Sequence, residues 1–306
     1  MLRFLMDRLF SIALTLAAVV TLTFFMMHAV PGGPFVQDKE VPQEVVAVLE
    51  AKYHLNAPLY KQYLNYVGGI LRWDLGPSYQ KVGLSVNDII NASFPVSMKL
   101  GGIAVLVVLL LGIPAGIVSA VKRDALPDHV IRLIVTLGQT IPNFVLATLL
   151  IYIFSAHFRI LPSYGLRTWK HYILPVMALS GYSLSFVARL TRSSMLETLQ
   201  QDYIRTARAK GVPEFQVIFK HALRNSLIPV VTYMGPMIAF ILTGSFVVER
   251  IFSIPGMGKF FVDSITNRDY TVLMGLTILN AILLCAAVLI VDILYGIIDP
   301  RIRVDK

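Results

Sequence analysis

Six long apolar runs limit, more than any other feature, how this chain can fold. They lie at about residues 9–30, 97–121, 130–158, 172–190, 228–248 and 272–298. Each has about 20 residues or more, which is the length that an α-helix needs to cross the hydrocarbon core of a bilayer. Backbone polar groups cannot be left unpaired in lipid, so these segments are expected to be helical. The sequence therefore predicts an all-α integral membrane protein with six transmembrane helices.

The composition agrees with this prediction. Of the 306 residues, 56% are hydrophobic and 15% are charged, whereas a soluble domain carries about a quarter charged residues. The formal net charge of +9 could indicate nucleic-acid binding, but the basic residues gather at the ends of the apolar runs. Membrane topology explains that pattern more simply. The single Cys285 excludes a disulfide framework and a cysteine-ligated zinc site.

The chain divides along its length into four predicted parts. Residues 1–30 are expected to be an N-terminal transmembrane helix, because the run ends in V-P-G-G-P without a small-residue cleavage pattern. Residues 31–95 follow as an extracytoplasmic segment. Residues 96–300 are expected to form a five-helix core that includes a cytoplasmic loop at 192–227, and residues 301–306 form a tail.

Basic residues beside the short loops predict the orientation, since cytoplasmic loops carry an excess of Lys and Arg. Such residues follow the second and the last apolar run and place both termini in the cytoplasm: they are Lys122, Arg123, Arg132, Arg301, Arg303 and Lys306. One loop disagrees, because this topology places it outside although it contains Arg159, Arg167 and Lys170.

The extracytoplasmic segment is the longest stretch predicted to lie outside the membrane. Apolar residues recur at helical spacing in 44–53 and 59–70, so two short helices are expected there. The segment would either cap the outer ends of the transmembrane helices or offer a docking surface, and the sequence leaves both interpretations open.

Small and helix-breaking residues interrupt several of the runs. Gly112 and Gly116 have the spacing that lets two helix backbones approach closely in lipid. Pro142 lies inside the third run, and the fifth contains Pro229, Gly235 and Pro236. Helices broken in this way are typical of bundles that bend or open a path.

The loop at 192–227 contains two predicted helices. The first covers about 202–210 and places Tyr203, Ile204 and Ala207 on one face. Gly211 is expected to end it, since glycine tolerates backbone angles that other residues resist. The second begins at Pro213, and its apolar stripe is Phe215, Ile218, Phe219 and Ala222. A basic loop with this content is either a topology signal lying on the lipid surface or a structure built to be bound by another protein.

This loop resembles the signature of ABC-importer permease subunits, E-A-A-x-x-x-G followed by nine residues and I-x-L-P. Ala207, Gly211 and Leu223 stand at the matching positions. The leading Glu, the next Ala and the closing Ile and Pro are replaced by Arg205, Thr206, His221 and Arg224. The strings R-T-A-R-A-K-G and K-H-A-L-R-N-S-L-I-P resemble the form that this loop takes in the peptide-permease branch.

Other blocks resemble the B-type subunit of oligopeptide and dipeptide permeases. They include H-A-V-P-G-G-P-F, E-A-K-Y-H-L-N, F-P-V-S, T-G-S-F-V-V-E-R-I-F-S-I-P-G-M-G-K and V-D-I-L-Y-G-I-I-D-P-R-I, and together they extend over nearly the whole chain. The resemblance implies the type I ABC importer (MetI-like) permease fold and a location in the bacterial plasma (inner) membrane.

The resemblance also implies function and partners. The chain would be the permease subunit of an ATP-driven peptide importer, with a homologous second permease subunit, two ATPase subunits or domains and an extracytoplasmic peptide-binding protein. The residues implied in coupling to the ATPase are Arg205, Thr206, Ala207, Ala209, Lys210 and Gly211. ATP and Mg would be bound by the ATPase and not by this chain, in which no cofactor, catalytic residue or metal site is expected. The only phosphate-loop-like string, at 255–259, lacks the first Gly and the Ser or Thr that such a loop needs.

Asp292 is the one acid well inside a predicted span, and an intramembrane acid is by default a candidate for function. It is a weak candidate for the translocation path, since Arg301 or Arg303 could pair with it in a structural role. A stand-alone secondary transporter or channel is the alternative class, and it would show internal repeats and several buried ion-coupling groups. A membrane-embedded enzyme would need paired catalytic side chains at membrane depth.

Overall fold

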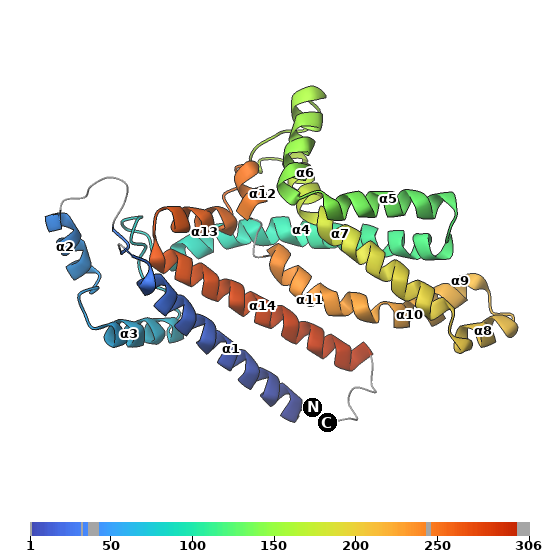
Figure 1. The fold of residues 1–306 in the computed structure, drawn as a ribbon, viewed down its shortest axis with the longest axis horizontal. Coiled ribbons are helices and arrows are strands. Elements are labelled where there is room, and N and C mark those ends of the chain that lie inside the picture. Colours follow the sequence, from blue (N-terminus) through green and yellow to red (C-terminus); the bar gives the residue numbers. More distant parts are fainter. Residues whose placement is uncertain (1, 32, 36–42, 243–245, 299–306) are drawn as a thin grey trace. The chain divides into compact units, whose positions relative to one another are not determined.

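The computed structural model describes residues 2–31, 33–35, 43–242 and 246–298, and these are mostly helical (Figure 1). The helices of this part of the chain, with the π-helices written as η, are α1 (Leu2–Ala29), α2 (Gln43–Lys52), α3 (Leu59–Leu71), α4 (Val86–Val121), α5 (Leu126–Thr140), α6 (Asn143–Leu150), η1 (Ile151–His157), α7 (Lys170–Leu199), α8 (Asp202–Ala209), α9 (Glu214–Gln216), η2 (Val217–Ala222), α10 (Leu223–Ser226), α11 (Ile228–Leu242), α12 (Phe246–Ile251), α13 (Met257–Thr266) and α14 (Tyr270–Ile298).

Five stretches are long and apolar enough to cross a membrane, and a bent pair of helices supplies a sixth candidate. The five are Met6–Ala29, Val86–Val121, Lys170–Leu199, Ile228–Ile251 and Tyr270–Ile293, of which the fourth runs across residues outside the described part. The predicted all-α membrane architecture is therefore confirmed. The two helices expected at 44–53 and 59–70 are present as α2 and α3.

The third predicted span is broken next to Pro142, the proline that the sequence places inside this apolar run. Its two halves, Leu126–Thr140 and Asn143–His157, are bent by 109° relative to each other. Pro142 explains the break, because a proline has no N–H for the helix and forces the preceding residue out of the helical region. Ile141 accordingly has φ −78° and ψ 118°, which is extended backbone.

Two boundaries differ from the predicted ones. Helix α4 begins at Val86 rather than near Ser97, because Ser85 and Asp88 form a reciprocal cap. The Asp88 carboxylate accepts from the backbone N–H and the hydroxyl of Ser85 at 3.0 and 2.6 Å, and the Ser85 hydroxyl accepts from the Asp88 N–H at 3.1 Å. Helix α7 continues past residue 190 to Leu199, so part of the predicted cytoplasmic loop extends the fourth span.

The chain forms two compact units. Unit 1 comprises residues 1–97 and 255–285, and unit 2 comprises residues 98–254 and 286–306. In unit 1, hydrogen bonds to the buried carboxylate of Asp269 connect the loop before α4 with the start of α14. The carboxylate accepts hydrogen bonds from the Ser78 hydroxyl and from the backbone N–H groups of Tyr79 and Gln80. An apolar core under this loop contains Leu75, Val86, Met257 and Leu276.

In unit 2, α7 is the central helix, and α5, α6, α10, α11 and α12 pack against it (Figure 1). Helix α4 also approaches it closely. A Cβ on Gly116 would lie 2.6 Å from the Ala188 carbonyl oxygen, and a Cβ on Gly112 would lie 3.1 Å from that of Leu184. The expectation that these two glycines permit a close helix crossing is confirmed, with α7 as the partner.

Candidate functional site

The segment from α8 to α10, which we call the coupling segment, has the predicted order of helix, glycine turn and helix. Helix α8 ends at Ala209, one residue before the predicted end. Gly211 follows with φ +75°, in the left-handed region that favours glycine. Its N–H donates to the Arg208 carbonyl at 2.9 Å, and the Val212 N–H donates to the Ala207 carbonyl at 3.2 Å. The turn therefore closes the end of α8 before the second helix begins.

The inner side of the coupling segment is part of an apolar core shared with α4 and α7. We call it the coupling core, and its buried members are Ile117, Ala120, Met195, Ile204, Val217, Ile218 and Ala222. The Ser226 hydroxyl also donates to the Met195 sulfur at 2.9 Å. The ends of α4 and α7 therefore belong to the same packed core as the coupling segment.

The second helix of the segment differs from its predicted pattern. Ile218 and Ala222 are buried as expected, but Val217 is buried beside them and the two phenylalanines of the predicted stripe face outward. Phe215 is 69% exposed and Phe219 is 47% exposed, with their ring centroids 4.6 Å apart. The cause is the π-helix η2, whose wider turn rotates the buried face relative to an α-helical stripe.

Five of the six predicted coupling residues lie on the exposed surface of this segment: Arg205, Thr206, Ala209, Lys210 and Gly211. The sixth, Ala207, is half-buried and packs against the coupling core. Its small side chain lets α8 lie close to the ends of α4 and α7, and its part in coupling stays a prediction.

An ion pair spans the glycine turn. The Arg208 guanidinium donates to the Glu214 carboxylate at 2.7 and 3.2 Å, which joins α8 to the start of α9. This hydrogen bond lowers the pKa of Glu214 below its ordinary value. Because both side chains are well exposed, we assign the pair a role in orienting the two helices rather than a large stabilisation.

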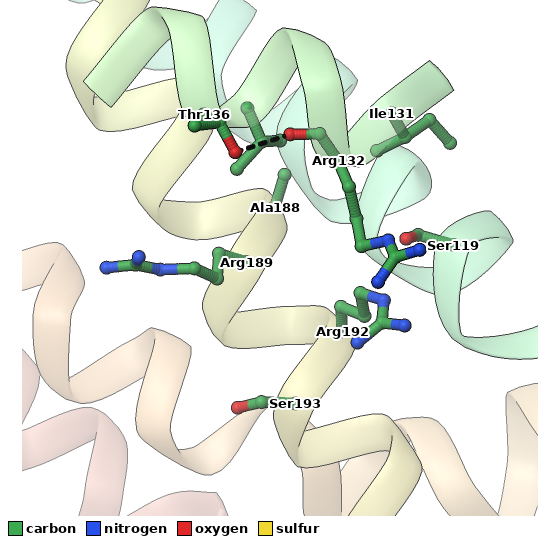
Figure 2. A pocket seen from close by; sticks show the side chains of 9 residues that line it. Ser119, Ile131, Arg132, Thr136, Ala188, Arg189, Arg192 and Ser193 are labelled. Atoms are coloured by element: carbon green, nitrogen blue, oxygen red, sulfur yellow. Dashed lines mark hydrogen bonds between the residues drawn. The ribbon is translucent and has the colours of Figure 1, made fainter. Parts of the chain in front are cut away.

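A second charged group, which the sequence pattern does not indicate, lies where α4, α5 and α7 meet. Asp128 is fully buried, and its carboxylate accepts from Nε and Nη2 of Arg192 at 2.9 and 2.8 Å. A cavity of about 180 Å³ adjoins it. Figure 2 shows the side chains of Arg132 and Arg192 close together beside Ser119, whereas Arg189 points away.

In the sequence, Arg132 is interpreted as a topology charge, and Arg192 is the first residue of the basic loop at 192–227. The local signal for a structural role was Asp128 in the first turn of a helix, four residues before Arg132. The contact with Arg192 joins residues 64 positions apart, so no local spacing indicates it.

Asp292 lies in α14 and is half-buried. Nearby, α11 approaches α14 closely, since a Cβ on Gly235 would lie 3.0 Å from Cγ2 of Val291. The predicted partners Arg301 and Arg303 are outside the described residues, so that pairing stays a prediction. Within the described ranges, no group of three or more His, Cys, Asp or Glu side chains is placed to hold a metal ion.

Comparison with known proteins gives the family. Residues 112–304 match the family described as binding-protein-dependent transport system inner membrane component. The chain belongs to this permease family. Residues 1–95 match the N-terminal region of membrane components of the same transport systems. The match favours the predicted permease subunit over a stand-alone secondary transporter.

Relatives of this permease match over its whole length. The dipeptide transport system permease protein DppB of Bacillus subtilis is 45% identical over 309 residues, which cover 100% of this chain and 99% of DppB. The oligopeptide transport system permease protein OppB of Salmonella typhimurium is 44% identical over 305 residues, or 99% of this chain and 100% of OppB. The OppB protein of Escherichia coli has the same identity and coverage.

Solved structures support the fold. An inward-facing structure of the MetNI methionine ABC transporter superposes with a TM-score of 0.58 at 17% identity, covering 69% of this chain and 96% of that chain. A second crystal form gives a TM-score of 0.53 at 19% identity, covering 67% and 95%. The predicted type I importer permease fold is thus confirmed. The permease is a multi-pass inner membrane protein, and its family implies work with a partner permease, ATPases and a binding protein.

Proposed function

We propose that this permease forms half of the translocation path of an ATP-driven importer of dipeptides or oligopeptides. The relatives named as dipeptide and oligopeptide permeases match it from end to end, which supports this substrate class. Its partners are a homologous second permease subunit, two ATPase subunits or domains and an extracytoplasmic peptide-binding protein. ATP and Mg are bound by the ATPases, and this chain contributes no catalytic residue.

The observation that carries the proposal is the two-sided packing of the coupling segment. Its inner side lies in one core with the ends of α4 and α7, and its outer side exposes Arg205, Thr206, Ala209, Lys210 and Gly211. In the proposed mechanism this outer side sits in a groove of one ATPase. Closure of the ATPases on ATP displaces the segment, and the shared core passes the displacement into the two helices.

Coupling of this kind has an energetic condition. The ATP-bound ATPases must favour one conformation of the permease over the other, since a partner shifts an equilibrium only by its difference in affinity for the two states. Contact with ATPases in the cytoplasm also requires the coupling segment to lie there. In the proposed topology both termini lie on that side as well, and residues 31–95 lie outside.

Cysteine crosslinking tests this arrangement, because Cys285 is the single native cysteine. In a Cys285→Ser background, Arg205→Cys and Lys210→Cys are expected to crosslink to the ATPase in the assembled complex. The matched control is Val82→Cys, which is 78% exposed in the loop before α4 and should give no ATPase crosslink. A complex that takes up labelled dialanine or tetra-alanine with ATP, yet crosslinks at neither position of the coupling segment, would contradict the proposed contact.

A further inference from the structure

Three helices of unit 2 meet at one buried carboxylate. Asp128, at the start of α5, is 0% exposed. Besides Arg192 of α7, it accepts from the Ser119 hydroxyl of α4 at 2.5 Å and from the Asp124 backbone N–H at 3.0 Å. The Arg132 Nε lies 3.7 Å away. Both carboxylate oxygens are thus engaged, and each is shared between different parts of the fold.

The cavity beside this carboxylate does not indicate a separate ligand site. Three of its lining residues are apolar and the other six are polar or charged, among them Arg132 and Arg192. The guanidinium of Arg192 already makes two hydrogen bonds to Asp128, and that of Arg132 lies close to the same carboxylate. The charges of Arg132 and Arg192 therefore belong to the contact between the helices, and Arg189 points away from it (Figure 2).

The ion pair of Asp128 and Arg192 differs from an ordinary buried ion pair in its position, because it lies next to the coupling core. Arg192 lies in the same helix as Met195, one turn before that buried member of the coupling core. Helices α4 and α7 are already held together by the close crossing at Gly116. Helix α5 has no member in the coupling core, and it is the first half of the bent α5–α6 pair.

Helix α5 packs extensively against α7, and at its other end a Cβ on Gly138 would meet the Ser185 side chain. These contacts are a matter of close packing, whereas the Asp128 contact is directional and charge-assisted. At the end of α5 next to the coupling core, Asp128 makes the directional contact between α5 and α7.

We propose that Asp128 is a positioning residue that ties α5 to α7, so that displacement of the coupling segment also moves the α5–α6 pair. This inference rests on the proposed function. Without the tie, ATP-driven displacement would still reach α4 and α7 but would reach the α5–α6 pair only through packing. Hydrolysis would then continue while transport decreased.

The test measures ATP hydrolysed per peptide transported, using the complete complex in proteoliposomes with labelled dialanine and tetra-alanine. The Asp128→Asn variant keeps the size of the side chain and loses the ion pair. We expect its ratio of ATP to peptide to rise about fivefold or more above that of the unmodified complex. A purely structural role would reduce the amount of assembled complex and lower both activities together, leaving the ratio unchanged.

Two further variants complete the test. Asp128→Asn combined with Arg192→Gln leaves no unpaired buried charge, so assembly is expected to recover while the ratio stays high. Asp124→Asn removes an exposed carboxylate that pairs with Arg123 and should leave the ratio unchanged. If the double variant hydrolysed no more ATP per transported peptide than the unmodified complex, the inference would be overturned. Failure of the proposed function is distinguishable, because the unmodified complex would then show no ATP-dependent uptake of either peptide.

Discussion

At the scale of the residue, Gly211 has the most demanding backbone in the coupling segment. Its φ of +75° is unfavourable for side chains, while the space around a Cβ at this position is open. A left-handed conformation costs an ordinary residue about 1–2 kcal/mol, and a β-branched residue resists it most. We expect Gly211→Val to insert and assemble but to lower peptide uptake about tenfold at retained ATP hydrolysis. Parallel assays of hydrolysis and uptake in proteoliposomes measure this uncoupling.

The matched control at this position is Gly211→Asn. Asparagine visits the left-handed region more readily than other residues with side chains, so this variant should transport nearly as well as the unmodified complex. If both variants transported normally, the turn angle at Gly211 would have no part in coupling.

Residues differ in how far their roles can be predicted from the sequence. The glycine turn and the burial of Ile204 follow from local spacing, and both are found in the structure. The ion pair of Asp128 with Arg192 depends on how α5 packs against α7, and nothing within either helix encodes that packing. Charge counting assigned Arg132 to topology alone, because it does not distinguish a guanidinium beside a buried carboxylate from one in water.

At the scale of the element, the length of the apolar runs predicts the spans, but the shapes of the helices need tertiary information. Pro142 predicts a break in the third run, but the size of the bend, 109°, depends on what the two halves pack against. The early start of α4 depends on a cap formed by Ser85 and Asp88, outside the apolar run. The π-helix η2 changes which residues of the second coupling helix are buried, and a stripe drawn at 3.6 residues per turn cannot anticipate it.

The rotated face of η2 gives a prediction with a built-in control. Phe215 and Phe219 are exposed, with their rings in contact and tilted relative to each other, whereas Ile218 is buried in the coupling core. Replacing both phenylalanines with serine should change the free energy of unfolding by less than about 0.5 kcal/mol, since exposed sites contribute little. Exposed aromatic pairs are typical anchors of interfaces, so the amount of ATPase that co-purifies should fall.

Ile218→Ser is the control for this pair. It removes buried apolar volume and buries a hydroxyl, which should destabilise the permease by about 3 kcal/mol. Thermal unfolding and co-purification separate the two effects. Undiminished ATPase binding by the double serine variant would show that the phenylalanines face no partner.

At the scale of the whole molecule, the bent α5–α6 pair decides the sidedness of everything after it. If the pair crosses the membrane, the chain has six spans, and the coupling segment lies on the same side as the N-terminus. If the pair instead enters and leaves on one side, the chain has five spans and the coupling segment lies on the opposite side. Contact with cytoplasmic ATPases is compatible only with the first arrangement, given a cytoplasmic N-terminus.

The loop between η1 and α7 distinguishes these arrangements, and its basic residues Arg159 and Arg167 make the result informative. In a Cys285→Ser background, Trp169→Cys, which replaces a residue 71% exposed, is expected to react with a membrane-impermeant maleimide added outside intact cells. Val82→Cys should react in the same way, and Lys210→Cys only after permeabilisation. Labelling at Val82→Cys but not at Trp169→Cys would make the pair re-entrant and place the coupling segment outside, away from any ATPase. Labelling at both would mean that six spans, and not the charges of this one loop, determine the topology.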